Sequence, residues 1–133
     1  MAEKKNLLLK ITALLYAIIA FLYGLNYLFF PELQIKMSAT EIIHPAWIRW
    51  FGGAMIALAY GSFRIYRNPA KQGIFVKTLC FGTLLVGLAL LYDPIFNWDS
   101  SFILLEQAIP AIIMLVVSLM FGISLRKSKE ILW

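Results

Sequence analysis

Four long runs of apolar residues, separated by short polar segments, dominate the sequence. They cover residues 7–30, 46–66, 74–92 and 102–125. An α-helix of roughly 20 residues crosses the hydrocarbon core of a bilayer, which is about 30 Å thick, and each run reaches that length. The period-two alternation of a membrane barrel is absent. Because the connections are short, the pattern predicts one all-α membrane domain over residues 1–133, an antiparallel bundle of four transmembrane helices.

Composition supports a lipid environment for these helices. The chain of 133 residues is 62% hydrophobic and 14% charged, with a mean hydropathy of +0.81. Soluble domains are about 45–50% apolar and about 25% charged. A chain of this size has too little interior to hide so much apolar surface from water.

The charges indicate how the predicted helices are oriented. Of the 12 lysines and arginines, all except Lys36 and Arg49 fall at the N-terminus, at the connection between the second and third runs, or in the C-terminal tail. Cytoplasmic segments carry such an excess of cations, so we expect both termini in the cytoplasm and the chain in the cell membrane. The net charge of +5 is then explained by orientation and lipid headgroups, and we expect no nucleic-acid partner.

A stripe of small residues follows Arg49 in the second run. Gly53, Ala57 and Gly61 come at successive spacings of four, and Tyr60 falls on the same stripe. Small residues at this spacing let helix backbones approach closely. We therefore expect this face to point into the bundle, with the three small residues packing against another helix and Arg49 directed toward protein.

Glu106 is the predicted partner of Arg49. It lies about one helical turn into the fourth run, at a similar depth, and Gln107 follows it. Ionisable residues inside membrane segments are costly and usually pair with each other. In the alternative interpretation, Arg49 reaches lipid phosphates and Glu106 is hydrated at the interface. Pro110 interrupts the helix and could open a small pocket around Glu106 and Gln107.

The first run carries hydroxyl groups along one stripe. Thr12, Tyr16, Tyr23 and Tyr27 share it, and Asn26 flanks its outer end. These hydroxyls either bond to neighbouring helices, which we favour because buried hydroxyls usually find protein partners, or line a cavity. The candidate polar cluster within the membrane comprises Arg49, Glu106, Gln107, Tyr23, Asn26, Tyr27 and Tyr60.

Motifs for catalysis or metal binding are missing from the sequence. It has one cysteine, Cys80, and one histidine, His44, and it has no phosphate-binding loop or nucleophile–base motif. We therefore expect no metal or cofactor, and the residues argue against an enzyme.

Two quoted stretches resemble a known family. "YGLNYLFFPE" ends the first run at Phe30-Pro31-Glu32, and "HPAWIRWFGGAMIALAYGSFRIY" opens the second with Arg49 before Gly52-Gly53. This layout is similar to that of small four-helix DoxX-like membrane proteins and neighbouring families of unknown function. The resemblance implies a four-helix bundle in the inner membrane of a bacterium or archaeon. Some DoxX-like members are associated with respiratory or redox membrane complexes, but no quinone or metal ligand carries over to this sequence.

Three classes of function remain open from the sequence. The favoured one is an interaction protein, either an accessory subunit of a membrane complex or a homo-oligomer, because the loops are too short to hold an enzyme domain outside the membrane. The alternative is a small oligomeric transporter or channel, in which Glu106 couples ions and Arg49 attracts anions. A lipid- or quinone-binding membrane enzyme is the third class, and no residue points to it.

Overall fold

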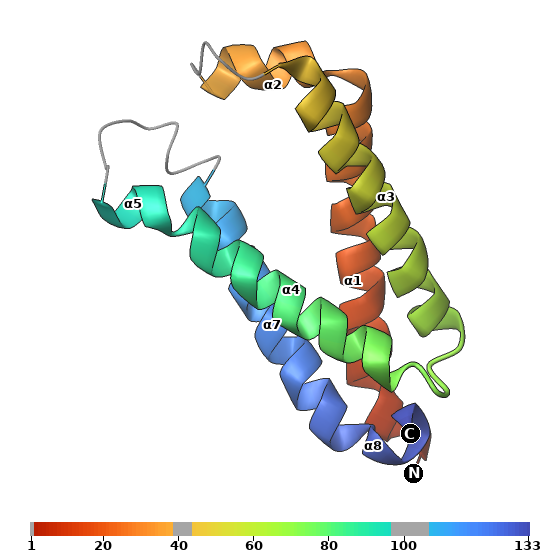
Figure 1. Ribbon diagram of the computed structural model, residues 1–133. Helices are drawn as coiled ribbons and strands as arrows, with labels where there is room; N and C mark the ends of the chain where they lie inside the picture. Colours follow the sequence, from red (N-terminus) through yellow and green to blue (C-terminus); the bar gives the residue numbers. More distant parts are fainter. Residues whose placement is uncertain (1, 39–43, 97–106) are drawn as a thin grey trace.

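The computed structural model describes residues 2–38, 44–96 and 107–133, and the regular structure in these ranges is helical (Figure 1). The four longest helices are α1 (Ala2–Phe29), α3 (Pro45–Arg67), α4 (Gly73–Leu90) and α7 (Ile109–Lys127). They correspond to the four predicted runs, although the first residues of the fourth run lie outside the described ranges. Three short helices accompany them: α2 (Pro31–Ser38), α5 (Tyr92–Phe96) and α8 (Lys129–Leu132).

Three segments of the described chain are long and apolar enough to cross a membrane. They are Asn6–Phe29, Gly73–Phe96 and Ile109–Lys127. Helix α3 has 23 residues and is long enough, but it carries three arginines and is not one of these three. A multi-pass membrane protein is consistent with this finding, while the fourth crossing by α3 stays a prediction.

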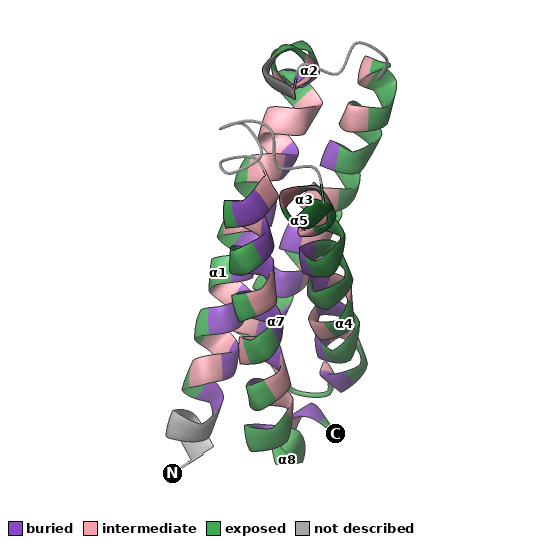
Figure 2. Ribbon diagram, turned by 90° about the vertical axis from the view of Figure 1, so that its left-hand side faces the viewer, coloured by how far each residue is buried: buried purple, intermediate pink, exposed green. Residues whose placement is uncertain are grey.

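The long helices are arranged as two pairs. Helix α1 packs along α3, and α4 packs along α7, while α1 also contacts α7. The pairs converge at the end that holds both chain termini and diverge toward α2 and α5 (Figure 1). Buried residues lie mainly where helices meet, and the outer faces are largely exposed (Figure 2). Which side of a membrane the end with the termini faces stays a prediction.

Small residues bring α1 and α3 into close contact. A Cβ atom added at Gly52 would lie 2.8 Å from the carbonyl oxygen of Gly24, so the two backbones touch at this point. Further along the pair, the Ser62 hydroxyl donates a hydrogen bond of 2.8 Å to the carbonyl oxygen of Ala13, and both residues are fully buried. Close backbone contact and hydrogen bonds of this kind are what hold membrane helices together. Lipid tails are as apolar as the side chains, so there is no hydrophobic driving force between the helices.

Helices α4 and α7 are joined by a polar contact between Cys80 and Ser118. The Ser118 hydroxyl donates to the carbonyl oxygen of Cys80 at 2.8 Å, and the Cys80 thiol donates to the carbonyl oxygen of Ser118 at 3.4 Å. About two helical turns after Cys80, Gly87 lies against the side chain of Leu115. The pair is therefore held by hydrogen bonds as well as by packing.

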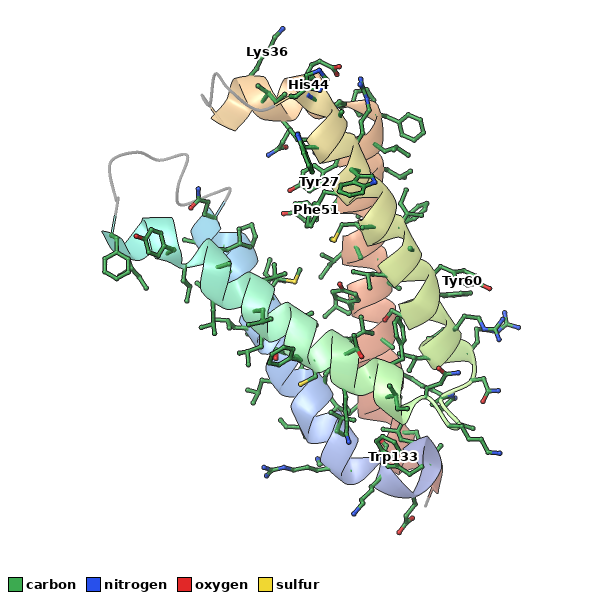
Figure 3. The ribbon with its side chains drawn as sticks, in the orientation of Figure 1. Tyr27, Lys36, His44, Phe51, Tyr60 and Trp133 are labelled. Atoms are coloured by element: carbon green, nitrogen blue, oxygen red, sulfur yellow. The ribbon has the colours of Figure 1, made fainter. Side chains whose placement is uncertain are left out.

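The convergent end is closed by α8 and the last residue. The ring of Trp133 lies against Gly73, and Lys77 Nζ lies 4.3 Å from the centroid of that ring (Figure 3). The backbone N–H of Lys71 donates to the carbonyl oxygen of Ile131 at 3.0 Å. These contacts tie the chain end to the connection between α3 and α4, so the two helix pairs are fixed to each other here.

Candidate functional site

A cleft of about 440 Å³ lies between the two helix pairs. This volume is within the range of about 300–1,000 Å³ that is usual for sites that bind small molecules. All four long helices contribute to its walls. The lining residues are Tyr16, Ile19, Tyr23 and Tyr27 from α1, Phe51, Met55 and Leu58 from α3, Thr78, Leu79, Gly82, Thr83, Val86 and Leu90 from α4, and Pro110, Ile113 and Met114 from α7.

The walls of this cleft are apolar, apart from a few hydroxyl groups. None of the lining residues in the described part of the chain is charged. Thr78 donates to the carbonyl oxygen of Ile74 at 3.0 Å, and Thr83 donates to that of Leu79 at 2.8 Å. Both threonine hydroxyls are thus satisfied within their own helix. The remaining side-chain hydroxyls in the lining belong to the tyrosines of α1.

The tyrosines form an aromatic wall along α1. The ring of Tyr16 meets Phe121 edge-on, with centroids 6.0 Å apart, where α1 crosses α7. Tyr23 and Tyr27 are in contact at 5.8 Å, and Tyr27 also meets Phe51 of α3 at 5.9 Å (Figure 3). The structure places these tyrosines at a cavity wall. The interpretation favoured from the sequence, in which their hydroxyls bond to neighbouring helices, stays a prediction. Thr12 instead donates within its helix, to the carbonyl oxygen of Leu8 at 2.8 Å.

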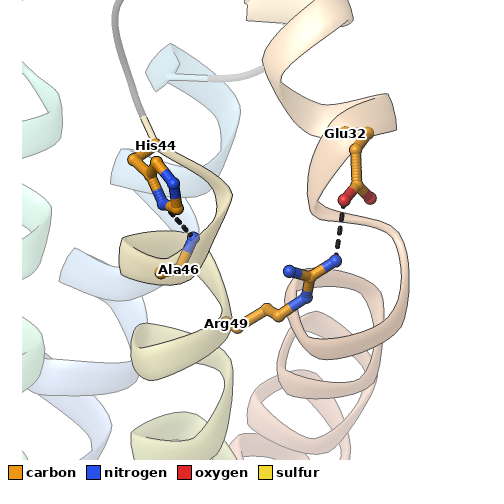
Figure 4. A network of polar contacts seen from close by, with 4 residues as sticks. All are labelled: Glu32, His44, Ala46 and Arg49. Carbon is orange, nitrogen blue, oxygen red and sulfur yellow. Dashed lines mark hydrogen bonds and ion pairs between the residues drawn. The ribbon is translucent and has the colours of Figure 1, made fainter.

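Arg49 forms an ion pair with Glu32, the second residue of α2. Its Nη2 atom donates to Glu32 Oε1 at 2.7 Å (Figure 4), and the side chains are 48% and 57% exposed. Exposed pairs of this kind typically contribute only about 0–1 kcal/mol. Glu106 lies outside the described residues, so the expected pair between Arg49 and Glu106 stays a prediction. The sequence did not single out Glu32 as a partner of Arg49.

The other polar residues near the divergent end are held locally. Asn26 Nδ2 donates to Gln34 Oε1 at 3.4 Å and so links α1 to α2. His44 caps α3, where its Nδ1 accepts from the backbone N–H of Ala46 at 3.2 Å (Figure 4). Gln107 is half-buried in a π-type turn just before α7, and Pro110 follows in the first turn of that helix. Of the members of the predicted polar cluster that the structure describes, only Tyr23 and Tyr27 line the cleft.

The stripe of small residues on α3 points away from the rest of the chain. A Cβ atom at Gly53 would have nothing within 4 Å, and Ala57 is exposed. Tyr60 is 64% exposed and extends outward from α3 (Figure 3). The expectation that Gly53 and Ala57 pack inside the bundle does not hold within this chain. Gly61 does pack here, against the ring of Phe75.

The buried face of α3 begins one residue earlier than predicted. Gly52, rather than Gly53, meets α1, and Ala59 and Ser62 follow on the same side. With about 3.6 residues per turn, neighbouring positions point about 100° apart, so a shift of one residue exchanges the two faces. The adjacent glycines Gly52 and Gly53 gave no sign of which one would be buried.

Metal chemistry finds no support in the geometry. The described residues contain no group of three or more His, Cys, Asp or Glu side chains that could hold a metal ion.

Comparison of the chain with protein-family models, with curated proteins and with solved structures gives no match. The resemblance to DoxX-like proteins thus stays a hypothesis, and the site defines an apolar cleft with a tyrosine wall.

Proposed function

We propose that this chain is a small integral membrane protein that acts by interaction, as an accessory subunit of a membrane complex or as a homo-oligomer. In this proposal it spans the cell membrane four times with both termini in the cytoplasm. The observation that carries the proposal is the uncovered outer face of α3, defined here as Trp50, Gly53, Ala57 and Tyr60.

Helix α3 is covered on one side only by the residues that the structure describes. It packs mainly along α1, and the residues of its outer face are all exposed. The three helices that are apolar enough to face lipid are α1, α4 and α7, yet α3 presents this large exposed surface. A less apolar helix with an open Gly53 and an exposed Ala57 is typical of contact with a further helix, because close backbone approach compensates for the lack of a hydrophobic driving force in lipid.

Tyr60 supports the same interface. Its phenol group projects from the outer face near the open small residues, and Tyr hydroxyls at protein contacts usually find a hydrogen-bond partner. The resemblance to DoxX-like proteins, some of which are associated with larger membrane complexes, agrees with an accessory role. The partner in this proposal is another membrane-spanning protein chain, either a second copy or a different subunit.

Photo-crosslinking in native membranes tests this role. A benzoylphenylalanine placed at Tyr60 should form a covalent adduct with protein, whereas the same residue at Phe81 of α4 should react with lipid. The two positions are matched, since both are aromatic and 64% and 63% exposed. An adduct of twice the chain mass identifies a homo-oligomer, and a different mass identifies an accessory subunit. Protein adducts that are no more abundant at Tyr60 than at Phe81 would contradict the proposal.

A small transporter or channel is the second candidate. It is favoured by the position of Pro110, which lines the cleft four residues after Glu106. The uncharged walls of the cleft argue against a path for ions along its length. In reconstituted vesicles, Glu106→Gln should abolish pH-dependent flux if Glu106 couples protons, and an unchanged flux would rule this coupling out.

A further inference from the structure

The dimensions of the cleft restrict what it can hold. It runs along α1 from Tyr16 to Tyr27, a length of about 16 Å at the rise of about 1.5 Å per residue. The cleft is therefore elongated, and its shape suits a chain-like molecule.

Apolar contact alone does not select an occupant in a membrane. Hydrocarbon tails are as apolar as the side chains of the lining, so a molecule gains little by leaving the bilayer for the cleft. Selection therefore requires a polar contact. The threonine hydroxyls of the lining are already bonded to their own helix. Tyr23 and Tyr27 also make interactions of their own, which leaves Tyr16.

Tyr16 offers such a contact at the end of the cleft that is nearer to the convergent end of the helix pairs. Its side chain is only 4% exposed, its ring is fixed against Phe121, and it belongs to the lining. Its hydroxyl makes no hydrogen bond with any other residue in the described part of the chain. The hydroxyl is not among the fully enclosed atoms without a partner, so a ligand can reach it. In apolar surroundings a hydroxyl without a partner is costly, because no water is present to replace the missing bond.

These observations specify a class of ligand. We propose that the cleft binds an elongated, uncharged, lipid-soluble molecule with a ketone, ester or hydroxyl oxygen near one end, and that this oxygen accepts a hydrogen bond from Tyr16. The chain of the ligand extends along the aromatic wall toward Tyr27 and Phe51. The proposal is independent of the interaction role, because its residues lie on the side of α1 and α3 that faces α4 and α7, away from the outer face.

The probes that test this site are 2-dodecanone and n-dodecane, which have equal chain lengths and differ in one carbonyl oxygen. Binding is measured as the excess of radiolabelled probe in nanodiscs that contain the protein over empty nanodiscs. The protein should bind the ketone about tenfold more tightly than the alkane, as expected for one buried hydrogen bond. Equal affinities would mean that the cleft takes up hydrocarbon chains without selection and would overturn the proposal.

Two variants assign the binding to Tyr16 and to the cleft. Tyr16→Phe keeps the ring on Phe121 and should lower the ketone affinity about tenfold, to that of the alkane, while Tyr60→Phe on the outer face should leave it unchanged. Gly82→Leu should abolish binding of both probes, because Gly82 lines the cleft and a Cβ atom there meets nothing within 4 Å. Ketone binding that survives either Tyr16→Phe or Gly82→Leu at the wild-type affinity, in protein of native helicity, would place the ligand elsewhere.

Discussion

The contact between Gly24 and Gly52 can be tested by adding a single methyl group. In Gly52→Ala the new Cβ would lie 2.8 Å from the Gly24 carbonyl oxygen and 2.8 Å from the backbone nitrogen of Leu28. Both are backbone atoms of the α1 segment, so neither can rotate away. Helices α1 and α3 must move apart to accept the methyl group. Gly53→Ala is the matched control, because it makes the same change one residue later, where nothing lies within 4 Å.

The expected difference follows from two opposing effects. Replacing glycine by alanine in a helix interior is worth about 0.5–1 kcal/mol in favour of the folded state, and this gain applies to both variants. Overpacking at Gly52 costs about 1–3 kcal/mol. Gly53→Ala should therefore be slightly stabilised, and Gly52→Ala should be destabilised by as much as about 2.5 kcal/mol. The two variants should therefore differ by about 1–3 kcal/mol in their free energy of unfolding. The gain from replacing glycine by alanine is the same in both variants, so it cancels from this difference.

Unfolding in mixed micelles measures this gap. The purified protein in a mild detergent is titrated with sodium dodecyl sulfate, and the loss of helix packing is followed by tryptophan fluorescence. Gly82→Ala, at a second open position, is a control for effects at the proposed interface near Gly53. A free energy of unfolding for Gly52→Ala equal to or above that of Gly53→Ala would refute the close approach of α1 and α3 at this point.

Three further changes test other contacts in the same assay. Ser62→Ala removes the buried hydrogen bond to α1 and should lower the free energy of unfolding by about 0.6 kcal/mol, and by no more than about 1.7 kcal/mol, as for other hydrogen bonds between membrane helices. An unchanged free energy of unfolding would contradict that bond. Gly87→Ala should be less destabilising than Gly52→Ala, because its two nearest atoms, at 2.8 Å, belong to the side chain of Leu115 and the nearest backbone atom, the carbonyl oxygen of Ala111, is 3.3 Å away. Leu115→Ala should relieve most of the loss. A double-mutant cycle on Arg49 and Glu32 should give a coupling of about 0.2–1 kcal/mol that vanishes in about 1 M salt, since the pair is exposed; a larger coupling that resists salt would indicate a buried pair.

The helices were predictable from the sequence because their length and apolarity are local properties. Their bounds in the structure agree with the runs within a few residues wherever the residues are described, except at Ala2–Phe29, which begins earlier than the predicted residue 7. Such features depend on each segment alone and not on how it meets its neighbours.

The rotation of α3 could not be predicted in the same way. Small residues mark a face that suits close packing, but they do not say whether the neighbour belongs to the same chain. The stripe at Gly53 and Ala57 and the stripe at Gly52 and Ala59 both satisfy the rule, and the structure assigns only the second to α1. The choice is made by the matching small residues of α1, chiefly Gly24, which lies opposite Gly52.

The partner of Arg49 depended on long-range geometry for a similar reason. Depth in the membrane suggested Glu106, which is remote in the sequence and outside the described residues. Glu32 was less conspicuous, but the turn from α1 through α2 to α3 brings it beside the first turns of α3. Ion-pair partners near the ends of helices are thus selected by the connections, which the apolar pattern does not describe.

The two-pair arrangement explains why both proposed sites involve α3. Contacts of α1 with α7 and of α8 with the α3–α4 connection fix the pairs at one end, so divergence at the other end leaves one edge of α3 facing a cleft and the opposite side uncovered. Phe51 and Met55 lie on the cleft edge, whereas Gly53 and Ala57 lie on the outer face. The described part of the chain leaves this face of α3 uncovered. In the proposed interaction role a further membrane helix would cover it, and the lower apolarity of α3 agrees with such a contact.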